Sequence, residues 1–134
     1  MKFILDTNIC IYIIKKKPAQ VFEKFKGLPL GSVGISSITL AELEYGVKKS
    51  AQPEKNQIAL NQFLIPLEIV DFDTNAATEY GKIRTDLERN GTPIGPLDTL
   101  IAAHVKSLEL ILVTNNKKEF KRVAGLQIEN WTKE

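Results

Sequence analysis

The chain has 134 residues, of which 43% are hydrophobic and 25% charged, and 18 basic against 16 acidic residues leave a net charge of +2. This length predicts one domain spanning residues 1–134, and the near balance of charge excludes a globally basic protein, so any nucleic-acid-binding surface is local. The lone Cys10 excludes an internal disulfide, and no segment approaches the length of a membrane span, so we expect a protein of the reducing cytoplasm.

Short apolar runs along the chain alternate with segments of helical periodicity. Apolar runs of this length, bounded by turn-forming residues, are typical of strands in the interior of a sheet. Strands are therefore predicted, in chain order, at residues 2–6, 33–36, 67–72, 110–113 and, at an edge of the sheet, 126–131.

The segments between these runs carry helix start and stop signals, such as proline at the start and glycine or asparagine at the end. Ile58 is expected to be buried with Leu60 and Phe63. Strands separated by helices predict an α/β fold, in which helices cover both faces of a parallel sheet of about five strands. Helices are predicted from Thr7 to about residue 15, over 18–27, from Thr39 to about residue 49, after Pro53, from about residue 74 to 90, and from Asp98.

Acidic residues fall at strand ends or on the helices beside them. The carboxyl ends of parallel strands share one edge of a sheet, where ligands bind, so we expect these side chains to face one crevice. The most informative is Asp6, because a carboxylate that ends a buried strand is costly without a partner. The set comprises Asp6 after the first strand, Glu42 on the helix after the second, Asp98 at the start of the helix before the fourth, and Glu119 after the fourth, with Asn8, Asn115 and Asn116 nearby.

Crowded carboxylates repel one another unless a cation joins them. A hard divalent ion such as Mg²⁺ or Mn²⁺ prefers oxygen ligands. Such a site suits phosphoryl chemistry, since the ion lowers the pKa of water and neutralises charge on a phosphodiester without a histidine base. The pattern therefore indicates metal-dependent phosphodiester hydrolysis.

Each acid except Asp6 also has a structural interpretation. Glu42 stands three residues after Thr39, so the two residues match a helix capping box. Asp98 is a good helix cap, and Glu119 is of the kind found on solvated surfaces. The functional interpretation depends on all four acids together.

Other chemistry finds little support. The lone histidine, His104, lies on an alanine-rich helix and is expected to be a packed residue. Ser36, Ser37 and Thr39 have no recognisable base to activate them, so a serine hydrolase is disfavoured. The sequence also contains no phosphate-binding glycine loop.

A local basic surface is predicted beside the last of the four acids. Lysines and an arginine follow the fourth strand, within a few residues of Glu119. Positive charge at this place is suited to holding phosphates. The residues are Lys117, Lys118, Lys121 and Arg122.

Four stretches carry a resemblance to a known family: "LDTNICIYII", "ISSITLAELEYG", "PIGPLDTLIAAH" and "LILVTNNKKEFKRV". Together, in this order and over essentially the whole chain, they resemble the PIN-domain ribonucleases and, within them, the VapC toxins of type II toxin–antitoxin pairs. The resemblance implies a three-layer α/β/α fold and Mg²⁺-dependent endonucleolytic cleavage of RNA. It carries the family's acids onto Asp6, Glu42 and Asp98.

The fourth acidic position departs from the family pattern. Many relatives have an aspartate where this chain has Asn116, and Glu119 follows three residues later. Asn116 is therefore a candidate metal ligand through its carbonyl oxygen, and Glu119 a candidate source of the missing charge.

The resemblance also implies partners: a VapB-type antitoxin that blocks the crevice, an RNA substrate of the tRNA class, and a homodimer that joins larger complexes with antitoxin. Two other functions stay open from the sequence, a Mg²⁺-binding receiver-like signalling domain and a non-catalytic RNA-binding module. A receiver-like domain requires adjacent acids after its first strand, whereas Thr7 and Asn8 follow Asp6.

Overall fold

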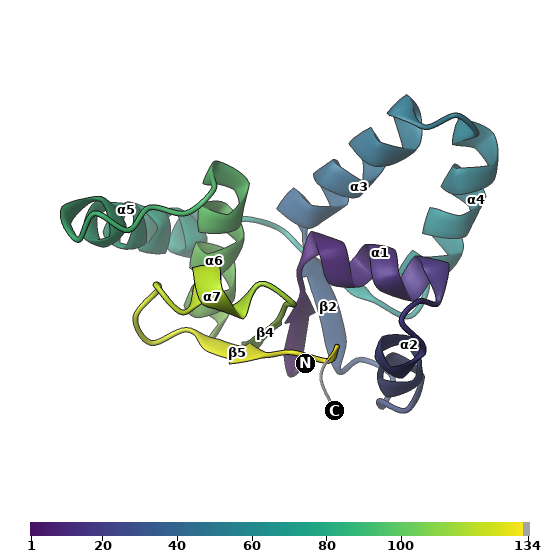
Figure 1. The fold of residues 1–134 in the computed structure, drawn as a ribbon, viewed down its shortest axis with the longest axis horizontal. Helices are drawn as coiled ribbons and strands as arrows, with labels where there is room; N and C mark the ends of the chain where they lie inside the picture. The colour runs from purple at the N-terminus through teal and green to yellow at the C-terminus, as the bar shows by residue number, and fades with distance from the viewer. Residues whose placement is uncertain (133–134) are drawn as a thin grey trace.

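A five-stranded parallel sheet forms the centre of the molecule (Figure 1). The computed structural model describes residues 1–132. The strand order is β3-β2-β1-β4-β5, so the first strand lies in the middle of the sheet, as expected for buried apolar runs. The strands are β1 (Phe3–Leu5), β2 (Val33–Ser36), β3 (Glu68–Val70), β4 (Ile111–Val113) and β5 (Gln127–Glu129), and each lies within or matches its predicted segment.

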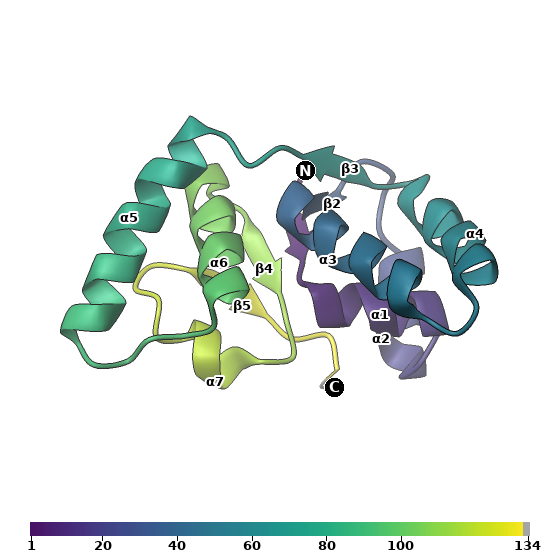
Figure 2. The same ribbon diagram turned by 90° about the horizontal axis from the view of Figure 1, so that it is seen from above.

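Helices cover both faces of this sheet, which confirms the predicted α/β/α arrangement (Figures 1 and 2). Helices α1 to α4 pack on one face, and α5 and α6 pack on the other together with α7. Within residues 1–132, none of the helices combines the length and apolar character needed to cross a bilayer. They are α1 (Thr7–Lys15), α2 (Ala19–Lys26), α3 (Ser37–Lys49), α4 (Pro53–Leu64), α5 (Thr74–Arg89), α6 (Pro96–Leu108) and α7 (Lys117–Phe120).

The side chains of β1 show why the sheet needs two helical layers. Phe3 and Leu5 enter the core under α1 to α4, whereas Ile4 enters the core under α5 and α6. All three are at most 4% exposed, so apolar area is removed from water on both faces of this strand. A strand of this kind has no solvent-facing side, and this is why the continuous run "FIL" suits it.

The C-terminal part of the chain returns to the first strand. The ring of Trp131 packs edge-on against Phe3, with 5.4 Å between ring centroids. Strand β5 lies at the edge of the sheet, as expected, next to β4. The two ends of the chain are thereby joined in one core.

Two helices begin earlier than predicted. Helix α3 starts at Ser37, with Ser36 as its cap: the Ser36 hydroxyl oxygen accepts from the Ile38 N–H at 3.0 Å. The capping box predicted between Thr39 and Glu42 is therefore wrong, because both residues lie inside the helix. Helix α6 starts at Pro96, since proline suits a first helical turn.

Two further predictions about local structure fail. Helix α7 was not predicted, because its four residues are too few to show helical periodicity. Ile58 is 61% exposed, whereas its neighbours Leu60 and Phe63 are buried as predicted. Ile58 and Leu60 are two residues apart, about half a helical turn, so they lie on opposite sides of α4, and only the side of Leu60 faces the core.

The topology places a crevice where the chain direction across the sheet reverses. From β1 the chain moves to β2 on one side, and later returns to β4 on the other side. Ligands bind at such a switch point, beyond the carboxyl ends of the strands. Here that point lies between the ends of β1 and β4, where the Asp6 N–H donates to the Val113 carbonyl at 3.0 Å.

Candidate active site

Asp6 stands at the end of β1 and is only 5% exposed. Its Oδ1 accepts a hydrogen bond from the Ile9 N–H at 2.9 Å, so the side chain caps helix α1. Burial is the main cause that raises the pKa of Asp6. Repulsion from Glu42 adds to this rise, and hydrogen bonds from the Thr114 hydroxyl and the Ile9 N–H oppose it. The cap explains how the aspartate is tolerated, yet the raised pKa shows that its charge is incompletely compensated.

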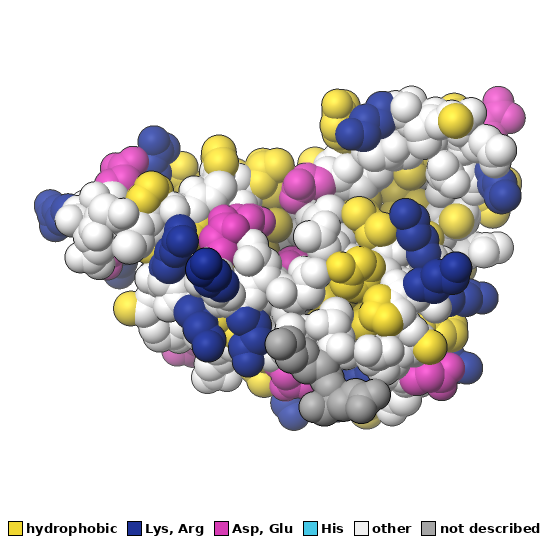
Figure 3. All heavy atoms as spheres, in the orientation of Figure 1, with side chains coloured by type: hydrophobic (Ala, Val, Ile, Leu, Met, Phe, Trp, Pro, Cys, Tyr) yellow, Lys and Arg dark blue, Asp and Glu magenta, His cyan; other side chains and the backbone are white. Residues whose placement is uncertain are grey.

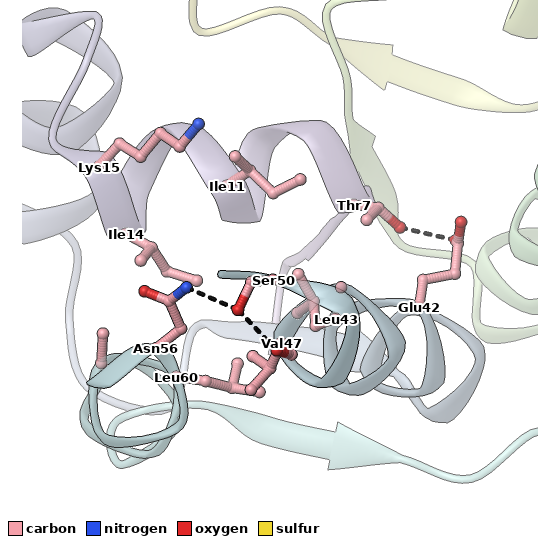
Figure 4. Close-up of a pocket in the computed structure, with 12 residues that line it drawn as sticks. Thr7, Ile11, Ile14, Lys15, Glu42, Leu43, Val47, Ser50, Asn56 and Leu60 are labelled. Atoms are coloured by element: carbon pink, nitrogen blue, oxygen red, sulfur yellow. Dashed lines mark hydrogen bonds between the residues drawn. The ribbon is translucent and has the colours of Figure 1, made fainter. Parts of the chain in front are cut away.

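Glu42 approaches the same place from α3. Its Oε1 accepts a hydrogen bond from the Thr7 hydroxyl at 2.7 Å, across 35 residues of sequence (Figure 4). Thr7 directly follows Asp6, so this contact joins the start of α1, which Asp6 caps, to helix α3, which carries Glu42. The carboxylate that the sequence could place in a capping box is instead directed towards the end of β1.

Asp98 and Glu119 form the other side of the crevice. Asp98 lies in the first turn of α6, and Glu119 lies on α7. Glu119 is held by two donors: Oε1 accepts from the Gly95 N–H at 2.9 Å, and Oε2 accepts from the Asn116 side-chain amide at 2.6 Å. Asn116 therefore directs its NH₂ group to Glu119, where it acts as a positioning donor.

The pKa values of Asp98 and Glu119 are shifted in opposite directions. The pKa of Asp98 is raised to about 7, first by burial, then by repulsion from Glu119, by a hydrogen bond with Glu119, and by repulsion from Asp6 and Glu42. The pKa of Glu119 is lowered, first by the hydrogen bond from the Gly95 N–H and further by Asn116, Asp98 and Arg122. A proton shared by this pair therefore resides on Asp98, which is also the acid on which the charges of the other three act.

The neighbouring asparagines Asn8 and Asn115 have different surroundings. Asn115 donates from its side-chain amide to the Tyr12 hydroxyl on α1 at 2.8 Å. Asn8 is exposed, and it is its backbone N–H that acts on Asp6.

Residues that the sequence did not single out complete the site. The Thr7 hydroxyl donates to Glu42, and the Thr114 hydroxyl acts on Asp6 by lowering its pKa. Thr7 stands two residues after the end of β1, and Thr114 directly after β4. Gly95 has no side chain that could cover the carboxyl groups of Asp98 and Glu119. A Cβ added there would lie 3.6 Å from Asp98 Oδ2 and 3.7 Å from Glu119 Oε1. The sequence signal for this position is weak: a glycine directly before the proline that begins α6, three residues before Asp98.

The donor set fits a hard divalent cation. Within residues 1–132, no three acidic, histidine or cysteine side chains are already gathered closely enough to surround one ion. Mg²⁺ commonly takes only one or two carboxylates and keeps several waters, so a pair such as Asp6 and Asp98 meets its needs. The raised pKa values of both groups record the cost of negative charge here, which a cation would remove.

Comparisons with known proteins agree with this geometry. The sequence profile of the PIN domain matches residues 3–126. The tRNA(fMet)-specific endonuclease VapC of Shigella flexneri is 51% identical over 132 residues, covering 98% of this chain and 99% of its own length. Ribonuclease VapC2 of Rickettsia felis is 48% identical over 134 residues.

Solved structures share the fold over the same length. A chain in the crystal structure of VapBC2 from Rickettsia felis, bound to promoter DNA, superposes with a TM-score of 0.92 at 47% identity and covers 98% of this chain and 99% of its own. A chain of VapBC-1 from nontypeable Haemophilus influenzae gives a TM-score of 0.89 at 36% identity, covering 99% and 100%.

The fold and the site thus define a PIN domain, a class whose nucleases depend on a metal ion. With relatives this similar over their full length, the chain belongs to the VapC ribonucleases of the PIN-domain family. The receiver-like alternative is therefore wrong.

Asp98→Asn tests the repulsion in the crevice. The folded-state pKa of about 7 lies above that of an unfolded aspartate, about 3.9, so stability from this group is lost as pH rises from about 4 through 7. The neutral asparagine avoids this loss. At pH 8 in EDTA we expect its free energy of unfolding to exceed that of the parent by about 1 kcal/mol, less than the pKa shift alone implies because solvent screens this half-exposed group.

Denaturant unfolding at several pH values measures the effect, with Asp86→Asn on α5 as an exposed control. The gain should vanish below about pH 4, where Asp98 is neutral in both states. An equal gain at pH 4 and pH 8 would contradict the repulsion.

Proposed function

We propose that this chain is the toxin of a toxin–antitoxin pair and cleaves RNA of the tRNA class as a Mg²⁺-dependent endonuclease, with Mn²⁺ as an effective substitute. The observation that carries the proposal is the convergence of four acids at the switch point, with the pKa of Asp98 raised to about 7. Support for the substrate comes from the Shigella flexneri relative, named a tRNA(fMet)-specific endonuclease.

The proposal gives each acid a role. Asp6 and Asp98 hold the ion directly, from opposite sides of the crevice. Glu42 completes the site or orients water, and Glu119 contributes the fourth charge. Asn116 serves Glu119 as a hydrogen-bond donor at 2.6 Å, which favours Glu119 over Asn116 as the fourth acidic group.

When bound, Mg²⁺ supplies a water of lowered pKa and neutralises charge that develops on the phosphodiester. The chain's own residues hold and orient the reacting groups. Thr7 and Thr114 fix the directions of Glu42 and Asp6, and the Gly95 N–H fixes Glu119. On binding a cation, Asp98 would release its proton to solvent.

A basic surface on the α7 side of the acids is suited to an RNA backbone. Lys118, Lys121 and Arg122 are exposed, and Arg122 is oriented by its hydrogen bond to the Pro93 carbonyl at 2.8 Å. Figure 3 shows basic side chains gathered beside the acidic centre of this face. Phosphates bound here would lead the strand towards Glu119 and Asp98.

An apolar groove between α1, α3 and α4 is suited to the antitoxin (Figure 4). It encloses about 350 Å³, and Ile11, Ile14 and Leu43 line its walls. Thr7 and Glu42 also line it, so the groove opens directly onto the acids. A helical segment with apolar side chains fits this groove, and a basic side chain at its end would pair with the acids. Relatives of this chain occur in VapBC complexes, and we propose the same hetero-oligomer, built on a homodimer, here.

Asp6→Asn tests the mechanism. Asparagine is an equally good helix cap, so the fold should survive, whereas the loss of a charged ligand removes several kcal/mol of stabilisation of the ion and the transition state. We expect cleavage of tRNA in Mg²⁺ to fall on the order of a hundredfold or more, and EDTA to abolish cleavage by the parent.

The matched control is Asp73→Asn, because Asp73 also follows a strand and caps a helix, through the Ala76 N–H at 3.0 Å, but lies outside the crevice. Control cleavage should stay at the parent rate. Full activity of Asp6→Asn in EDTA would refute the mechanism. RNA binding without cleavage by the parent would favour the non-catalytic RNA-binding alternative.

Replacing Lys118 and Lys121 by alanine tests the RNA surface. Each lost phosphate contact lowers the slope of log affinity against log salt by about 1, so the double variant should bind tRNA more weakly and with a slope smaller by about 2. Filter binding to catalytically inactive protein measures this. Lys24 and Lys55, exposed on α2 and α4, are the control pair, and an equal change in their slope would contradict the assignment.

Gly46→Leu tests the antitoxin groove. Gly46 lines the groove, and a Cβ there meets no atom within 4 Å, so a larger side chain fills the groove without disturbing the core. We expect affinity for the cognate antitoxin to fall at least about tenfold, because the occupant loses apolar contacts, while RNA cleavage persists. Gly81→Leu on α5, also in open space, is the control. Unchanged antitoxin affinity of Gly46→Leu, measured by calorimetry, would place the antitoxin elsewhere.

A further inference from the structure

A buried serine–histidine pair joins the end of β2 to helix α6. Nδ1 of His104 is 2.8 Å from the Ser36 hydroxyl oxygen, although 68 residues separate them in sequence. His104 is 1% exposed and Ser36 is fully buried. The expectation that His104 is a packed residue is confirmed, whereas the expectation that Ser36 lacks a partnered base is wrong.

The pair has none of the access that a nucleophile needs. The Ser36 oxygen already accepts the Ile38 N–H, and no surface of this residue reaches solvent. Within residues 1–132, no group lies in hydrogen-bonding geometry with the buried Nε2 of His104, and the Asp71 backbone carbonyl acts on the ring more weakly, so the pair lacks the carboxylate partner of a catalytic triad. The pair therefore acts through its position.

That position links the helices of two acids. Ser36 caps α3, which carries Glu42 six residues later, and His104 lies on α6, six residues after Asp98. Six helical residues span about 9 Å. In Figure 2, α6 and α3 lie nearest one another at the start of α3 and spread apart along its length. The Ser36–His104 contact lies where α3 and α6 are closest. It therefore sets the distance between side chains that lie away from it on the two helices, such as Glu42 and Asp98.

We propose that His104 is a positioning residue: its hydrogen bond with Ser36 fixes the spacing of Glu42 and Asp98 and thereby sets the affinity of the crevice for a divalent cation. This inference rests on the metal site of the proposed function. It extends that function to a residue outside the crevice.

Neighbouring contacts make this link rigid. The ring of Phe72 packs edge-on against His104, with 5.4 Å between centroids and 72° between planes. The Phe72 N–H also donates to the Ser37 hydroxyl at 3.1 Å. Adjacent serines thus hold the start of α3 to two different elements, α6 and the segment after β3.

The neutral imidazole is the form that suits the link. Burial lowers the pKa of His104, and the Asp73 and Asp71 carboxylates and the Asp71 backbone carbonyl oppose this only in part. With Nδ1 as acceptor, the Ser36 hydroxyl donates to His104 while its oxygen accepts from Ile38. A doubly protonated ring would leave the serine proton without an acceptor.

The experiment compares His104→Leu and His104→Asn. Leucine keeps an apolar side chain of similar size but loses the acceptor, whereas the Asn Oδ1 can replace Nδ1. Mg²⁺ is titrated calorimetrically without RNA, and tRNA cleavage is measured against Mg²⁺ concentration, at a temperature where circular dichroism shows every variant folded. We expect His104→Leu to weaken Mg²⁺ binding about tenfold, as for outer residues of metal sites, and His104→Asn to restore most of it.

Val105→Ala is the matched control. Val105 is fully buried on the same helix and packs in the core under α5 and α6. Its truncation therefore lowers stability without removing the hydrogen bond to Ser36. Its Mg²⁺ affinity should equal that of the parent. Ser36→Ala removes the same hydrogen bond and the α3 cap as well, so it should weaken Mg²⁺ binding at least as much as His104→Leu does. The double variant should bind Mg²⁺ as Ser36→Ala does, because the shared interaction is already lost.

The outcomes separate the two proposals. If the parent binds Mg²⁺ and His104→Leu binds it equally well, or if Val105→Ala weakens binding as much, the positioning role is overturned and the proposed function stands. If the parent neither binds Mg²⁺ nor cleaves RNA in its presence, the proposed function itself fails.

Discussion

Asp98 shares one crevice with Asp6, Glu42 and Glu119, and burial together with repulsion from these carboxyl groups raises its pKa to about 7. The fold keeps like charges together at a cost in stability, and hydrogen-bond donors hold three of the four acids in place: the Ile9 N–H holds Asp6, the Thr7 hydroxyl holds Glu42, and the Gly95 N–H holds Glu119. Without these donors the side chains would turn to solvent and the repulsion would relax. The arrangement is stable enough to persist and strained enough to favour a cation.

Each of the two helical layers contributes two of the four acids to this crevice. Asp6 and Glu42 come from elements that pack with α1 to α4, and Asp98 and Glu119 come from elements that pack with α5 and α6. The Ser36–His104 contact crosses from the first group to the second beneath the acids. The groove and the basic surface then approach the acids from opposite sides, so a protein partner and a nucleic acid would meet at the same four groups.

Much of this arrangement could be predicted from the sequence. The apolar runs place all five strands, and the rule for parallel sheets brings Asp6 and Glu119 to one edge. Cap positions could not be predicted as well, because Ser36, Ser37 and Thr39 are equally good caps and only tertiary contacts choose Ser36. The pairing of Ser36 with His104 spans 68 residues, and no local pattern records it. The exposure of Ile58 depends on which side of α4 meets the sheet, and that is a property of packing.

The crevice is assembled from both ends of the polypeptide, which bears on its biosynthesis. Asp6 and Glu42 leave the ribosome early, but Glu119 and the strand β5 follow much later in the chain. The packing of Trp131 on Phe3 likewise requires residues that are made after helices α1 to α7. A nascent chain therefore lacks the full set of four charges until synthesis has passed Glu119. Folding of the first strands and helices during translation cannot by itself complete the crevice.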